Sequence, residues 1–146
     1  MDISTEVCVR EVLEVIPIVM RSLRREFRSH RGNDLGIPQY RALMFLQRNP
    51  GASLSTVADH LGITPPSTSK LIDGLVERGF IYRQSSEIDR RRINLGLTPA
   101  GADLADYSYQ EAQTTYIERF SMLPEETLVR ITEAMQALRP IFDPDK

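Results

Sequence analysis

The sequence has very little cysteine and histidine and no tryptophan. Its 146 residues include one cysteine, Cys8, and two histidines, His30 and His60. A single cysteine cannot close an intrachain disulfide, and these three residues cannot supply the four ligands of a structural zinc site. We therefore expect neither a bound metal nor a cofactor.

Long apolar runs are missing too. No stretch approaches the roughly 18 apolar residues of a membrane span, and Asp2 and Glu6 stand where a signal peptide carries basic residues. The sequence therefore predicts a cytoplasmic protein. With 41% hydrophobic and 26% charged residues, it has the composition of a soluble globular domain, long enough to bury a core without a covalent crosslink.

The residue types of the common catalytic sites do not occur together. No Ser/His/Asp or Cys/His arrangement, phosphate-binding loop or pair of metal sites can be assembled from this sequence. We therefore expect that the protein is not an enzyme.

Charge is distributed unevenly along the chain. The net charge is -2, but residues 15–98 contain 13 Lys and Arg against 7 Asp and Glu, a balance of +6. Residues 99–146 contain 4 against 9, a balance of -5. One part of the protein can thus face phosphate while the acidic part faces away from it.

The first segment has the apolar spacing of an amphipathic helix. Steps of four and three residues connect Val9, Leu13, Ile16, Met20, Leu23 and Phe27. Pro17 lacks a backbone N–H, so the helix either kinks there or restarts with Pro17 in its first turn. Residues 30–34 contain the polar and glycine residues that end it.

Three further helices are predicted in the middle of the chain. Pro38 opens one of them, and Leu54 to Leu61 forms the next, capped by Ser53 or Ser55. Gly62 ends that helix, and another runs from Pro65 to Arg78 with Thr64 as its N-cap. Two short helices joined by a tight glycine turn form a helix-turn-helix, whose second helix can enter the DNA major groove.

A hairpin is predicted directly after the helix-turn-helix. Phe80 to Arg83 and Ile93 to Leu97 have the composition of strands, and the loop from Ser85 to Arg92 connects them. A long helix from Pro99 to Phe120 and a last one from Pro124 to Phe142 complete the chain. The predicted fold is mainly α with a small β-hairpin wing, a winged helix-turn-helix.

The second helix of the helix-turn-helix has an exposed face suited to DNA. Its predicted buried face consists of Thr68, Leu71, Ile72, Leu75 and Val76. Removing that face leaves Pro66, Ser67, Lys70, Asp73, Gly74 and Glu77. Ser67 can donate to a base edge or phosphate, Pro66 can contact a thymine methyl, and Lys70 can donate to guanine. Asp73 and Glu77 would repel phosphate, so we expect only the first two turns to enter the groove. The alternative is that these residues only start a helix.

The hairpin loop carries consecutive arginines. Arg90, Arg91 and Arg92 follow Asp89 at its tip. Arginine suits a narrow minor groove, whose negative potential attracts a weakly hydrated guanidinium. Asp89 is expected to orient an arginine, because a free carboxylate is unfavourable beside phosphate. The alternative is an ordinary solvated turn.

These motifs together resemble the MarR family of winged helix-turn-helix transcriptional regulators. Asp89-Arg90-Arg91, followed by Leu97-Thr98-Pro99-Ala100-Gly101, is similar to the family's wing signature, Asp-x-Arg and then Leu-Thr-x-x-Gly. Residues 15–142 fit the six-helix layout. The resemblance implies DNA contacts from Pro66, Ser67, Thr68 and Lys70 and a minor-groove contact from Arg91. Lys70 stands where the family often has arginine, which leaves bidentate reading of guanine open.

The resemblance also implies a homodimer. The chain is then one MarR-like domain, residues 1–146, with dimerisation helices at about 3–30 and 99–142 and a winged helix-turn-helix at about 38–98. Its partner is double-stranded DNA with an inverted-repeat operator, because two recognition helices lie about one DNA turn apart. The alternative is that the terminal helices cover their own domain.

Regulation is expected through a small molecule. The resemblance implies a repressor that a small aromatic or phenolic anion releases from DNA, with a pocket that includes Arg24, Arg28, His30 and Tyr40. One alternative is a peroxide sensor that acts through Cys8, although neighbouring glutamates disfavour its thiolate. Another is a winged helix used only for protein contact.

Overall fold

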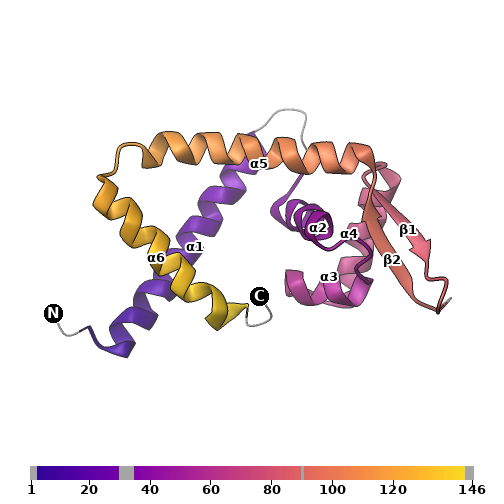
Figure 1. The fold of residues 1–146 in the computed structure, drawn as a ribbon, viewed down its shortest axis with the longest axis horizontal. Helices are drawn as coiled ribbons and strands as arrows, with labels where there is room; N and C mark the ends of the chain where they lie inside the picture. Colours follow the sequence, from indigo (N-terminus) through magenta and orange to yellow (C-terminus); the bar gives the residue numbers. More distant parts are fainter. Residues whose placement is uncertain (1–2, 30–34, 90, 144–146) are drawn as a thin grey trace. The chain divides into compact units, whose positions relative to one another are not determined.

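The computed structural model describes residues 3–29, 35–89 and 91–143, and only the backbone of residues 27–29. Within them lie six helices and one antiparallel hairpin, which confirms the predicted fold class (Figure 1). The chain forms two compact units, residues 1–110 and 111–146.

The first unit begins with a long helix, α1 (Thr5–Ser29). It runs without a break through Pro17, so the predicted alternative of a restart at that residue is wrong. Apolar side chains along α1 are exposed, and Leu13, for example, is 67% exposed. The segment expected to end the helix, residues 30–34, lies outside the described residues.

Three helices and the hairpin, which Figure 1 shows together, supply most of the core of the first unit. They are α2 (Ile37–Arg48), α3 (Leu54–Leu61), α4 (Pro65–Glu77), β1 (Ile81–Ser85) and β2 (Ile93–Leu97). Each contributes fully buried apolar side chains to one cluster, including Leu43, Leu46, Val57, Ile72, Leu75, Ile81 and Leu95. Removing this apolar surface from water is the main force that holds the helices against the hairpin.

The hairpin bonds both to itself and to the helical core. β1 and β2 pair antiparallel, from Ile81 opposite Leu97 to Ser85 opposite Ile93. Leu95 also donates its N–H to the Ala52 carbonyl and accepts from the Gly51 N–H, each at 2.9 Å. These two bonds attach β2 to the segment that leads into α3.

The start of α5 (Pro99–Phe120) is fixed to the junction between α4 and β1. The Thr98 hydroxyl accepts from the Gly101 N–H at 3.1 Å and donates to the Gly79 carbonyl. The Thr98 N–H bonds to the Phe80 carbonyl at 3.1 Å. A Cβ on Gly101 would lie 2.0 Å from that Phe80 oxygen, so the backbones approach more closely there than any other residue allows. These contacts explain the Leu-Thr-x-x-Gly motif.

The second unit consists of the end of α5, a short turn and α6 (Glu125–Phe142). α6 begins after Pro124, as the sequence predicts. No residue of α6 is buried, and exposed apolar side chains include Met135 at 47% and Phe142 at 70%. In the part of the chain that is described, no helix combines the length and apolar character needed to cross a membrane.

Candidate nucleic-acid interface

The turn between α3 and α4 sets where the second helix of the helix-turn-helix begins. Ser53 caps α3 by accepting from the Thr56 N–H at 3.3 Å, so it, and not Ser55, is the N-cap. Gly62 ends α3 with φ of +69°, a conformation that glycine adopts without strain, and its N–H bonds to the Ala58 carbonyl at 2.9 Å. The chain therefore reverses tightly, and α4 starts at Pro65.

Thr64 organises the first turn of α4 and the orientation of Ser67. Its hydroxyl accepts from the Ser67 N–H at 3.3 Å and donates to the Ser67 hydroxyl oxygen at 2.9 Å. In the second of these bonds the Ser67 hydroxyl acts as an acceptor. Its own hydroxyl hydrogen remains for a base edge or a phosphate.

Thr68 corrects one of the predicted DNA contacts. Its side chain is completely buried, and its hydroxyl donates to the Thr64 carbonyl at 3.0 Å. It lies on the inner face of α4 with Ile72 and Leu75, so it cannot reach a base edge. Thr68 supports the recognition helix from inside, because helical spacing places residue 68 opposite the exposed face.

The exposed face of α4 carries the other predicted contacts. Pro66, Ser67 and Lys70 are all exposed. Lys70 borders an open hollow of about 350 Å³ that Gln39 of α2 also lines. The exposed start of α4 therefore carries small side chains and one cation, which suit a helix that enters a major groove.

The tip of the wing is held by a set of short-range hydrogen bonds. Ser86 donates its N–H to the Arg92 carbonyl at 2.9 Å, and the Arg92 N–H bonds to the Asp89 carbonyl at 2.9 Å. The Asp89 carboxylate accepts from the Arg91 backbone N–H at 3.0 Å. Arg91 and Arg92 have exposed side chains, whereas Arg90 lies outside the described residues. Asp89 thus positions the backbone that carries Arg91.

An ion pair joins the recognition helix to the wing. The Arg83 guanidinium of β1 donates to the Asp73 carboxylate of α4, and both side chains are partly exposed. The sequence analysis did not single out Arg83, because a spacing of ten residues across a helix–strand junction is not a helical or strand periodicity. A basic residue on the first wing strand and an acid on the exposed face of α4 were the available signals.

The sequence also did not predict the structural role of a second arginine, Arg41. This half-buried α2 side chain donates to the carbonyls of His60 at 2.8 Å and Leu61 at 3.4 Å. These carbonyls belong to the last turn of α3, the negative end of the helix dipole. The His60 ring also stacks on Phe45 of α2 at 4.4 Å between centroids. Together these contacts hold α3 against α2.

The residues predicted to hold a small anion are only partly described. Arg24 is exposed on α1, the side chain of Arg28 is not described, and His30 lies outside the described residues. Tyr40 is half-buried, and this burial, with a smaller effect from Tyr109, raises the pKa of its phenol above the usual value. The predicted pocket therefore stays a prediction.

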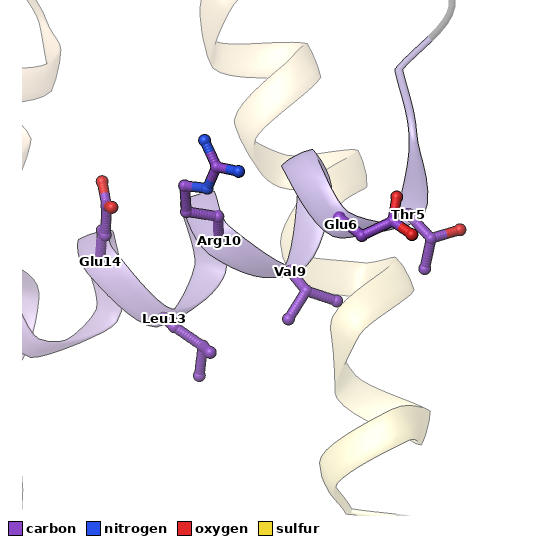
Figure 2. A pocket seen from close by; sticks show the side chains of 6 residues that line it. All are labelled: Thr5, Glu6, Val9, Arg10, Leu13 and Glu14. Atoms are coloured by element: carbon purple, nitrogen blue, oxygen red, sulfur yellow. The ribbon is translucent and has the colours of Figure 1, made fainter.

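Another hollow, of about 480 Å³, lies along α1. It is open, and side chains of this single helix line it, including Val9, Arg10 and Leu13 (Figure 2). Val9 and Leu13 project from one side of the helix and Arg10 and Glu14 from the other (Figure 2). Cys8 is an exposed free thiol on the same helix. Within the described residues, no group of three or more His, Cys, Asp or Glu could hold a metal ion.

A helix-turn-helix with a capped, exposed second helix and an arginine-bearing hairpin bonded to its core defines the class of protein. It is a winged helix-turn-helix.

Comparisons with known proteins show which family part of this chain is similar to. Residues 33–92 match the MarR family. The chain is 27% identical over 105 residues, 72% of its length, to the uncharacterized HTH-type transcriptional regulator YfiV of Bacillus subtilis. It is 32% identical over 81 residues, 56% of its length, to the HTH-type transcriptional regulator PetP of Rhodobacter capsulatus. These matches span 66% of YfiV and 48% of PetP.

A solved structure agrees in fold. FabT of Streptococcus pneumoniae, in complex with DNA, superposes with a TM-score of 0.76 at 19% identity, over 98% of this chain and all of FabT. The match to the MarR family covers 60 of the 146 residues, whereas the likeness in fold to the solved structure extends over nearly the whole chain.

Proposed function

We propose that this protein is a dimeric transcriptional regulator that binds DNA in a sequence-specific manner and is not an enzyme. The observation that carries this proposal is the placement of two DNA-reading elements on one core. The exposed start of α4 presents Ser67 and Lys70, and the ordered hairpin tip presents Arg91. Hydrogen bonds between Leu95 and residues 51 and 52 hold that hairpin to the helix-turn-helix. The DNA complex of FabT, which shares this fold, supports the same use.

The two elements supply different kinds of contact. Pro66, Ser67 and Lys70 enter the major groove, where donors and acceptors distinguish all four base pairs. Arg91 enters the adjacent minor groove, where width and potential favour A·T-rich sequence. A dimer repeats both contacts, so the operator is an inverted repeat with half-sites about one turn apart.

The binding itself is tested with duplexes selected by the protein from a random pool. Operator affinity should fall steeply as salt rises, because cations that contact phosphate release counterions. A winged helix used only for protein contact would select no duplex and would show no salt-dependent binding. That result would remove the proposed function.

Substitutions at Lys70 and Arg91 should have different effects on DNA binding. Lys70→Ala is expected to change which operator bases matter, by about 1–3 kcal/mol at the base it contacts. Arg91→Ala is expected to weaken binding broadly and to remove the preference for A·T-rich flanks. Binding to operators with single base changes measures both effects. Equal, sequence-independent losses from the two variants would mean that Lys70 contacts only phosphate.

We further propose that the protein is a repressor and that a small aromatic carboxylate or phenol weakens its DNA binding. The support is the exposed cation Arg24 and the half-buried phenol of Tyr40, two residues of the effector pocket predicted from the sequence. A tenfold loss of operator affinity requires about 1.4 kcal/mol of difference between the ligand affinities of the competent and incompetent states. Millimolar aromatic acids are therefore expected to reduce operator binding measurably in a titration.

Cys8→Ser provides the control for this prediction. It should leave both the operator affinity and the response to aromatic acids unchanged. If peroxide abolishes operator binding in the parent protein but not in Cys8→Ser, and aromatic acids have no effect, the protein is a peroxide sensor instead. In that case the exposed thiol on α1 is the regulatory group.

A further inference from the structure

We propose that the ion pair between Asp73 and Arg83 is a positioning device that fixes the wing relative to the recognition helix. The proposal rests on the proposed DNA-binding function. It assigns to these two residues a part in sequence discrimination without direct base contact.

The ion pair connects α4 to the first strand of the wing. Asp73 lies on the exposed face of α4, nine residues after the N-cap, and Arg83 lies in the middle of β1. α4 and β1 pack against each other and are connected by a tight turn, in which the Phe80 N–H bonds to the Leu75 carbonyl at 2.9 Å. The pair thus crosses the junction between the two DNA-reading elements.

The strand register places Arg83 on the inner face of the hairpin. Arg83 pairs with Leu95, which is buried, and it is two residues from Ile81, which is also buried. Alternation along the strand therefore places Arg83 on the face that packs on the helices and not on the outer face. This orientation directs the guanidinium toward α4 and away from the hairpin tip.

The positive charge of Arg83 neutralises the carboxylate of Asp73. An acid on the groove face of a recognition helix repels phosphate unless a cation neutralises it. Arg83 supplies that cation to Asp73. Glu77, one turn further along α4, is exposed and makes no ion pair with any described residue. Of these two acids, Asp73 is paired with a cation and Glu77 is not paired with any described residue. Glu77 therefore provides a matched control.

Because the ion pair is partly exposed, its loss should affect DNA discrimination more than the stability of the fold. The side chains are 38% and 53% exposed, and ion pairs at such sites contribute little to the stability of a fold. We therefore expect the pair to affect discrimination by the wing while the melting temperature stays nearly constant. A loosened wing should lower operator affinity relative to random DNA by about fivefold for each half-site.

The test compares four variants, Asp73→Asn, Arg83→Gln, their combination and Glu77→Gln. Affinities are measured for a duplex selected by the parent protein and for a scrambled duplex, at several salt concentrations. Asp73→Asn should lower the operator-to-scrambled ratio and raise the salt slope by about one for each half-site, because the released Arg83 can contact phosphate. Arg83→Gln should lower the ratio without raising the slope.

The combined variant and the Glu77→Gln control distinguish a positioning role of the ion pair from a general effect of charge on DNA binding. The combined variant should lose no more discrimination than either single variant, since both remove the same interaction. Glu77→Gln should strengthen binding to both duplexes equally and leave the ratio unchanged. Losses that multiply in the combined variant, or an Asp73→Asn variant that behaves like Glu77→Gln, would overturn the proposal. If the parent protein selects no duplex, the proposed function fails first, and the two failures are therefore distinguishable.

Discussion

Replacing Gly101 with alanine is expected to lower the free energy of unfolding by about 3 kcal/mol, at the upper end of the cost of overpacking. The added Cβ would lie 2.0 Å from the Phe80 carbonyl oxygen and 2.9 Å from its carbon. Neither atom can rotate away, because both belong to the backbone and the same oxygen accepts from the Thr98 N–H. α5 must therefore shift away from the junction. Chemical denaturation followed by circular dichroism measures this change.

Gly74 in α4 is the matched control for Gly101. It is also a helical glycine, but no heavy atom lies within 4 Å of an added Cβ. Gly74→Ala should therefore stabilise the protein by about 0.5–1 kcal/mol, because alanine loses less conformational freedom on folding. An unchanged denaturation midpoint for Gly101→Ala would show that the junction can relax, and the explanation of the Leu-Thr-x-x-Gly motif would then be wrong.

Replacing Met135 with aspartate is expected to convert the proposed dimer to monomer and to lower operator affinity about a hundredfold or more, because the two half-sites are then no longer bound together. Met135 is 47% exposed in the single chain. It belongs to the apolar stripe of α6, which consists of Leu128, Ile131, Met135, Leu138 and Phe142. A dimer that covers this stripe would have to bury an unpaired carboxylate, which costs several kcal/mol. Light scattering measures the mass, and a binding titration measures the affinity.

Ala137→Asp is the control for this prediction. Ala137 is also exposed on α6 but lies on the opposite face, so the same added charge should leave the mass and DNA affinity unchanged. Circular dichroism of Met135→Asp should show unchanged helix content, since exposed substitutions alter stability by only about 0.5 kcal/mol. A dimer mass for Met135→Asp would reject the placement of α6 in the interface.

Local signals in the sequence predicted most of the fold. The limits of α3, the start of α4 at Pro65 and the start of α6 after Pro124 are as expected. Each depends on a cap, a proline or a glycine within a few residues, and such preferences act through the nearby backbone. The strand β1 was less accurate: it was expected from Phe80 to Arg83 but runs from Ile81 to Ser85, because Gln84 and Ser85 also pair with β2.

The predicted site was correct in outline, but its internal contacts were not accessible to sequence reasoning. Periodicity placed Thr68 on the buried face of α4, and the family resemblance placed it among the DNA contacts, a conflict that its complete burial resolves. No helical or strand periodicity links Arg41 or Arg83 to its partner. Their partners lie 19 and 10 residues away, on other elements.

The sequence by itself determined the order of elements, the exposed start of the recognition helix and the arginines of the wing, because helix caps, turns and apolar periodicity are properties of short segments. Only the tertiary structure decided which charges are paired and how closely backbones approach. Asp73 meets Arg83, and Gly101 meets the Phe80 carbonyl, because packing of the core brings α4, β1 and α5 together. Contacts between elements depend on that packing, and no local pattern records them.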